Sequence, residues 1–155
     1  MNSHSERRGR IAGIDYGTVR LGIAITDVAR KMASPYENYT RCDADRDAVR
    51  LRQLVEEEQV TMFVVGLPVH VSGNESQKSF EARQFGAWIQ EQTGCDVVFF
   101  DERYSSKLAE ELLQDADLTS KQRKKRRDML AAQILLQGYL ESGGDGVEDP
   151  GPLDD

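Results

Sequence analysis

The order of apolar segments along the 155-residue chain predicts an α/β fold, in which helices flank a five-stranded mixed sheet. Three short segments with strand-like patterns come first, and helical and strand-like segments alternate after them. The connections between the first three strands are short, which favours an antiparallel meander. Each later strand follows a helix, and this arrangement favours parallel pairing with helices on both faces.

The first two strands are expected to form a hairpin over residues 10–16 and 20–26, joined by a turn that contains glycine. Side-chain alternation places Asp15 on the same face as Ile11 and Gly13. Asp15 is therefore an acidic residue within an otherwise apolar strand. A carboxylate inside a sheet loses its hydration at a large cost in free energy, unless a cation or several hydrogen-bond donors replace the water.

Two explanations of Asp15 stay open from the strand alone. A bound divalent metal ion would supply the missing positive charge, because no basic residue lies beside Asp15 in the strand. Alternatively, Asp15 stands at a strand end, where it caps a turn or pairs with Arg20. In either case Gly17 and Gly22 are positions where the backbone could approach a phosphate closely.

Seven further elements are expected after the hairpin. Pro35 suits an edge strand, and the helix patterns each show apolar residues at helical spacing. In one of these helices, Phe80, Phe85 and Trp88 are expected to face the core, and Gly94 ends it. The expected elements are a strand at 32–40, a helix at 43–59, a strand at 61–65, a helix at 74–92, a strand at 96–100, a helix at 105–114 and a final helix at 119–141.

Composition favours one globular domain, with 39% hydrophobic and 30% charged residues. No segment approaches the length of a membrane span, and the charged N-terminus lacks the apolar stretch of a secretory signal. Cys42 and Cys95 lie far apart, which suits a reducing cytoplasm. We therefore expect a cytoplasmic monomer or homodimer with no membrane partner. Its domain spans residues 10–140, between a disordered N-terminus at 1–9 and a disordered acidic tail at 141–155.

The net charge of −7 conceals a strongly basic segment. The last fifteen residues contain six acidic side chains and no basic ones, so that the rest of the chain carries a net charge near −1. Cations at the start of a helix oppose its dipole, which favours a role in phosphate binding over the alternative of a solvated helix start. The six cations of this basic segment are Lys121, Arg123, Lys124, Lys125, Arg126 and Arg127.

Acidic side chains from three distant segments are expected to meet at one edge of the sheet. Asp15 comes near the end of the first strand, and Asp101 and Glu102 follow the last one, where functional groups of open α/β sheets gather. In the final helix, Asp128 shares a face with Leu135, seven residues later. Three such carboxylates are the minimum ligand set for one or two Mg²⁺ or Mn²⁺ ions, which prefer oxygen.

Four blocks of sequence carry a resemblance to a known family. They are DYGTVRLGIA at 15–24, VVGLP at 64–68 with Gly73 after it, DERYSS at 101–106 with Ala109 and Glu110 after it, and DMLAAQILLQGYL at 128–140. Over these blocks the chain resembles the YqgF/RuvX-like family, whose members are described as Holliday-junction-resolvase-like proteins and as pre-16S ribosomal RNA nucleases. The resemblance implies the RNase H-like fold of these proteins.

The resemblance also implies an activity and a site. The implied activity is that of a metal-dependent nuclease, a hydrolase that processes the ends of precursor 16S ribosomal RNA. Asp15, Glu102 and Asp128 are the implied catalytic residues and, with Asp101, the candidate ligands of Mg²⁺ or Mn²⁺. Arg20, Arg103 and the basic segment are the implied contacts to structured RNA or branched DNA, although Arg103 could equally form a surface ion pair.

The chain departs from the family at two points. The fourth strand ends in Gly66, Leu67 and Pro68, where related resolvases have an acid, so that the pair after the last strand must substitute. Glu102 is the expected ligand of that pair, because its longer side chain can turn back over the strand end. Arg127 stands where the family has an apolar residue. Two other functions stay open: a DNA endonuclease of the Holliday junction type, and a protein that binds nucleic acid without cutting it.

Overall fold

The computed structural model describes residues 9–67, 77–101 and 119–143, and this part of the chain contains five strands and three helices. The helix expected at 105–114 lies outside it, as do most of both expected disordered ends. Among the described residues, none of the helices has the length and apolar composition of a membrane-spanning segment. The elements are β1 Arg10–Asp15, β2 Arg20–Thr26, β3 Ala33–Thr40, α2 Ala44–Glu58, β4 Val60–Leu67, α3 Gln77–Thr93, β5 Asp96–Asp101 and α5 Ser120–Glu141.

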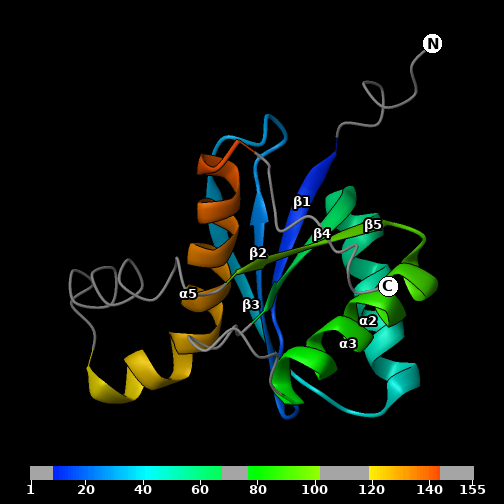
Figure 1. The fold of residues 1–155 in the computed structure, drawn as a ribbon. Helices are drawn as coiled ribbons and strands as arrows, with labels where there is room; N and C mark the ends of the chain where they lie inside the picture. The colour runs from blue at the N-terminus through cyan, green and yellow to red at the C-terminus, as the bar shows by residue number, and fades with distance from the viewer. Residues whose placement is uncertain (1–8, 68–76, 102–118, 144–155) are drawn as a thin grey trace.

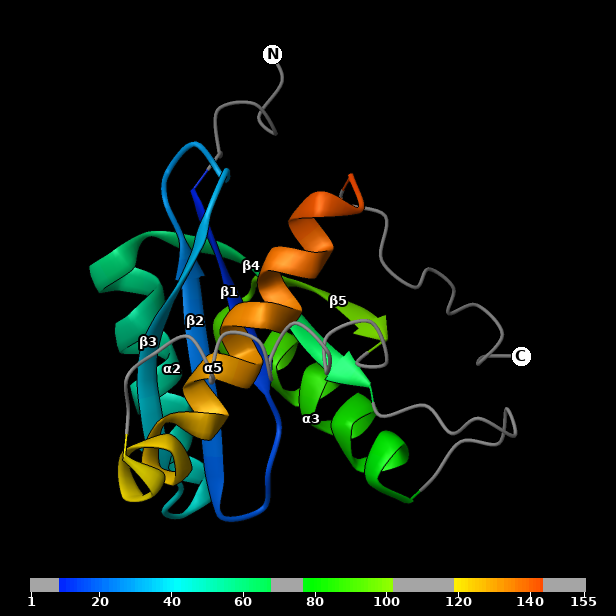
Figure 2. The ribbon, with the colours of Figure 1, turned by 90° about the vertical axis from the view of Figure 1, so that its left-hand side faces the viewer.

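The strands form one mixed sheet in the order β3-β2-β1-β4-β5. β1, β2 and β3 pair antiparallel as a meander, whereas β4 and β5 run parallel to β1. α2 and α3 cover one face of the sheet, and α5 crosses the other (Figures 1 and 2). The predicted fold class is therefore confirmed, including its three antiparallel strands followed by parallel ones.

Two hydrophobic clusters lie on the two faces of the sheet. Ile14 belongs to the cluster under α2 and α3, together with Leu51 and Phe85. Ile11 belongs to the cluster under α5, together with Leu135. β1 is buried on both faces because a layer of helices lies on each side of it, which explains its nearly continuous apolar sequence.

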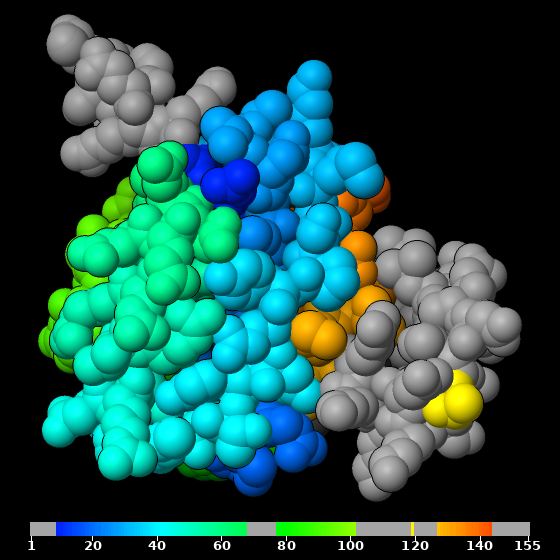
Figure 3. Space-filling model, turned by 180° about the vertical axis from the view of Figure 1, so that it is seen from behind, coloured from blue at the N-terminus to red at the C-terminus, as the bar shows by residue number. Residues whose placement is uncertain are grey.

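Strand β3 lies at one edge of the sheet, as Pro35 predicts. Proline has no N–H group to donate to a neighbouring strand, and here it pairs with Ala24 beside a shift in register. Figure 3 views the molecule from this side, where the surface of β3 lies between those of α2 and α5.

One aromatic side chain differs from expectation. Phe80 is 52% exposed, although Phe85 is buried and Trp88 packs against the core. Five residues separate Phe80 from Phe85, which places their side chains about 140° apart around the helix. The buried stripe of α3 runs instead through Ala82, Phe85 and Ile89. The prediction that Phe80 faces the core is therefore wrong.

Candidate active site

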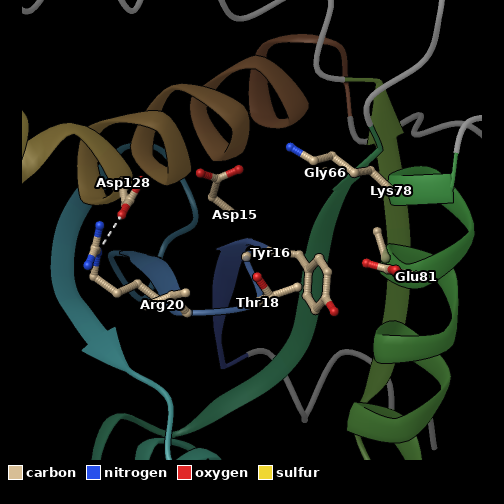
Figure 4. A pocket seen from close by; sticks show the side chains of 11 residues that line it. Asp15, Tyr16, Thr18, Arg20, Gly66, Lys78, Glu81 and Asp128 are labelled. Carbon is tan, nitrogen blue, oxygen red and sulfur yellow. Dashed lines mark hydrogen bonds and ion pairs between the residues drawn. The ribbon is translucent and has the colours of Figure 1, made fainter.

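Asp15 is the last residue of β1 and is half-buried. It pairs with Gly22 in β2 and, as alternation predicts, shares the α5 face with Ile11 and Gly13. Asp15 therefore stands at the end of the strand, a position that the sequence had left open. The strand-end position reduces the desolvation that the carboxylate experiences, and it directs the side chain toward α5 (Figure 4).

Two glycines allow α5 to approach this face of the sheet. A Cβ atom at Gly22 would lie 1.9 Å from the backbone oxygen of Asp128, and one at Gly13 would lie 2.9 Å from the Cβ of Leu136. The missing side chain at Gly22 is therefore the reason that Asp128 can lie over β2. The sequence suggested that Gly22 admits a phosphate; the group it admits is the backbone of α5 instead.

A pocket of about 410 Å³ lies where these elements meet (Figure 4). Its walls come from segments far apart in the chain, since α5 reaches it from one face of the sheet and α3 from the other. Asp15 and Asp128 both line it, so that the structure brings these two predicted site residues to the same pocket. The other lining residues are Tyr16, Gly17, Thr18, Val19, Arg20, Gly66, Lys78, Glu81 and Ala82.

Arg20 forms an ion pair with Asp128, with 3.3 Å between its Nε and a carboxylate oxygen. The side chains are 50% and 31% exposed, so that solvent weakens the pair to at most about 1 kcal/mol. Its importance is electrostatic: Asp128 and Asp15 line the same pocket, and the guanidinium offsets part of the repulsion between like charges. A pair between Asp15 and Arg20 was one alternative that the sequence left open, and the ion pair observed here joins Arg20 to Asp128.

Asp101 ends β5 and is not among the described residues that line the pocket. It pairs with Leu67, which belongs to the cluster under α2 and α3, whereas the preceding Phe100 belongs to the cluster under α5. Its side chain is only 6% exposed. Asp101 therefore lies on the face of the sheet opposite Asp15, and the structure does not bring the two together as the sequence suggested.

The remaining predicted site residues are described only in part. Glu102 and Arg103 lie outside the described residues. Lys121, Arg123, Lys124, Lys125 and Arg126 lie in the first turns of α5, and next to them the side chain of Arg127 is exposed. Within the described ranges, no three His, Cys, Asp or Glu side chains come close enough together to hold a metal ion.

A half-buried cation supports the turn between β1 and β2. Arg41 donates from one guanidinium nitrogen to the backbone oxygen of Gly17 (3.2 Å) and from Nε to Asp47 (3.1 Å). The guanidinium also lies over the rings of Tyr16 and Phe85, 5.6 and 5.1 Å from their centroids. The turn that carries Arg20 into the pocket therefore rests on a cation, which Asp47 holds in place.

Asp47 is 1% exposed and accepts hydrogen bonds from Arg41, the Cys42 amide and the Tyr39 hydroxyl. Burial alone would raise the pKa of Asp47, but these hydrogen bonds outweigh it and lower the pKa below its ordinary value. Its place in the first turn of α2 also suits the helix dipole. A signal for its burial was present, since Asp47 lies four residues before the buried Leu51 on the same helical face.

Lys78 and Glu81 are pocket residues that sequence reasoning missed. They lie in the first turns of α3, one turn apart, and enter the site because α3 begins beside the end of β4. No motif surrounds them in the sequence, so that only the tertiary arrangement reveals them.

Residues 9–142 match the family model described as "RuvX: Holliday junction resolvase". Two relatives named "Putative pre-16S rRNA nuclease" show the extent of the similarity. The protein from Rhodopirellula baltica is 42% identical over 134 residues, which cover 86% of this chain and 78% of the relative. The protein from Koribacter versatilis is 33% identical over 150 residues, which cover 97% of this chain and 98% of the relative.

Two Holliday junction resolvases are among the solved structures that share this fold. RuvC of T. thermophilus, in complex with its Holliday junction substrate, has a TM-score of 0.58 at 17% identity, covering 89% of this chain and 98% of that one. The fowlpox virus resolvase with Holliday junction DNA has a TM-score of 0.55 at 13% identity, covering 88% and 99%. At these identities the likeness shows the fold alone, which is the RuvC-like, RNase H-like fold that the sequence predicts.

Proposed function

The chain belongs to the RuvX family, and from this membership we propose that it is a metal-dependent nuclease that processes the ends of precursor 16S ribosomal RNA. The observation that carries the proposal is the pocket at the end of β1, which is lined by both Asp15 and Asp128. These two acids are 113 positions apart in the chain, and they reach the same pocket because Gly22 allows α5 to lie directly on the sheet.

The donor atoms of this pocket fit a hard divalent cation. Carboxylate oxygens are the ligands that Mg²⁺ and Mn²⁺ prefer, and Asp15 and Asp128 would hold the ion, with Glu102 as the third acid. Asp128 already attracts one positive charge, that of the Arg20 guanidinium, which is consistent with cation binding at this place. When bound, the metal ion polarises the scissile phosphate and lowers the pKa of a water molecule that attacks it.

The protein's own side chains then position the substrate. Arg20 and Arg127 are exposed cations close to Asp128, one in β2 and one in α5. Together with Arg103 and the basic segment of α5, they would contact phosphates on either side of the cleaved bond without reading base sequence. Side chains of this kind orient the backbone of the nucleic acid, while the acids define the point of cleavage.

The test compares cleavage of two substrates, with and without a divalent metal ion. Purified protein is incubated with Mn²⁺ or with EDTA, on a structured RNA that carries precursor 16S ends and on a four-way DNA junction. We expect cleavage of the RNA with Mn²⁺ and none with EDTA. Preferential cutting of the junction would assign the protein to DNA resolution instead, as the family's description suggests. Binding without cutting of either substrate would leave only the non-cleaving function.

Asp15→Asn is the decisive variant, because asparagine keeps the volume of the side chain and removes its charge. We expect cleavage to fall by more than about a hundredfold, since even partners outside the metal's direct ligands are worth about 10–100-fold. Stability without metal should stay level or rise, because repulsion between carboxylates is relieved. Asp45→Asn, at an exposed position of α2, is the matched control. Equal cleavage by the two variants would exclude Asp15 from the site.

A second comparison assigns the acid after β5. Glu102→Gln should lose cleavage, whereas Asp101→Asn should keep it once any loss of stability is allowed for. The reason is that Asp101 is buried on the α3 face, away from Asp15. The opposite ranking would mean that the sheet edge rearranges when the metal binds.

A further inference from the structure

The pocket has a second wall, formed by the start of α3. Lys78 lies in the first turn of this helix and is exposed. In Figure 4 its side chain extends from α3 across the pocket toward Asp15, which lies between Lys78 on one side and Asp128 with Arg20 on the other. The acid at the end of β1 is thus flanked by cations from two different layers of the fold.

The charged side chains on the two walls of the pocket have different partners. Among the described lining residues, Arg20 and Lys78 carry positive charge, and they belong to opposite walls. Arg20 is engaged by Asp128, whereas on the α3 wall Glu81 accepts a hydrogen bond from the amide of Gln77 at 3.2 Å. A phosphodiester that enters over Asp15 would therefore meet a separate cation on the α3 side.

The pocket surface between Lys78 and Asp15 includes a glycine. Gly66 of β4 lines the pocket there and has no side chain that could block a strand of nucleic acid. Lysine suits such a place, because its long flexible stem carries a compact charge that can follow a phosphate without a fixed geometry. α5 and its basic segment lie on the other side of Asp15, so that a strand crossing the sheet edge would run from α5 toward α3.

We propose that Lys78 binds a phosphate of the nucleic-acid strand on the α3 side of the cleaved bond. The inference rests on the proposed nuclease function and adds to it the path of the substrate across the end of the sheet. The competing explanation is that Lys78 only pairs with Glu81, three residues later on the same helix, and contributes a small amount to helix stability.

The experiment measures binding separately from cleavage. The salt dependence of binding to the structured precursor RNA is determined in the Asp15→Asn background, with and without Lys78→Gln. One lost phosphate contact should reduce the slope of log K against log salt concentration by about 0.7–0.9 and weaken binding several-fold at low salt. In the otherwise unchanged protein, Lys78→Gln should also slow cleavage, whereas Lys78→Arg should preserve both properties.

Lys31→Gln is the matched control, because it removes the same charge from an exposed lysine between β2 and β3, at the opposite end of the sheet. An equal salt slope for Lys78→Gln and Lys31→Gln would overturn the proposal. If Lys78 pairs only with Glu81, then Lys78→Gln and Glu81→Gln would each lower the melting temperature slightly and leave the slope unchanged. Failure of the nuclease function itself is distinguished by the cleavage assay, in which the parent protein and Asp15→Asn would then behave alike.

Discussion

Gly22→Ala tests how the site is assembled, because it places one methyl group between β2 and α5. The new Cβ would lie 1.9 Å from the backbone oxygen of Asp128 and 2.4 Å from its carbonyl carbon. Ordinary van der Waals contact begins at 3.4 Å, so that the helix must retreat by about 1.5 Å. The atoms in the way are backbone atoms, and no change of side-chain rotamer can relieve the contact.

The expected loss of stability follows from this overlap. Overpacking costs about 1–3 kcal/mol, and a clash with backbone belongs at the upper end of that range. A loss of about 3 kcal/mol lowers the melting temperature of a chain of this size by roughly 6–12 °C. Cleavage should fall further than stability suggests, because a displacement of about 1 Å in a catalytic group can reduce the rate about a hundredfold.

The assay combines thermal and urea unfolding with cleavage measured well below the melting temperature. Gly13→Ala is the matched control, since its Cβ would lie 2.9 Å from the side chain of Leu136 and 3.2 Å from the backbone oxygen of Ala132. That smaller overlap should cost about 1 kcal/mol and affect cleavage much less. Wild-type stability and activity in Gly22→Ala, or a larger effect of Gly13→Ala, would refute the proposed packing of α5.

Two further predictions concern charged side chains. Asp47→Asn should destabilise the protein by about 2–3 kcal/mol at pH 7, because charge-assisted hydrogen bonds to the turn-supporting Arg41 are lost. Folding lowers the pKa of Asp47, so its contribution to the free energy of unfolding is complete above the unfolded pKa of about 3.9 and disappears as the pH falls through the folded pKa. In urea unfolding, the difference in stability between wild type and variant should therefore become smaller below about pH 4. Replacing Lys124, Lys125 and Arg126 with Gln should weaken RNA binding and reduce its log–log salt slope by about 2–3, whereas an unchanged slope would mean that the basic segment faces away from the substrate.

Local pattern alone predicted much of the fold. The apolar runs of the chain predicted all the described strands and helices in their correct order, because period-two and period-3.6 patterns are properties of neighbouring residues. Pro35 predicted the edge strand for an equally local reason, its missing N–H group. Alternation along β1 placed Asp15 on the face that α5 covers, and helical spacing from Leu135 placed Asp128 on the face of α5 that packs on the sheet.

Local pattern could not decide on which face of the sheet the acid at the end of β5 lies. β5 is apolar on both faces, so that its sequence does not distinguish them, and the face of Asp101 is settled only by the register of β5 with β4. Local pattern likewise did not distinguish Asp47 from an ordinary acidic residue in the first turn of a helix. Its burial depends on Tyr39 and Arg41, which a different element brings against it.

The amino-acid sequence was therefore sufficient to predict the set of elements, their order and the two acids that share the pocket. Tertiary structure alone decided the distance between α5 and the sheet at Gly22, the support of the β1–β2 turn by Arg41, and the entry of Lys78 into the pocket from the opposite face. The physical reason is that the periodicity of apolar residues indicates which side of a helix or strand is buried. Contacts between elements depend instead on how whole layers pack, and at Gly22 the absence of a Cβ atom allows the backbones of β2 and α5 to meet.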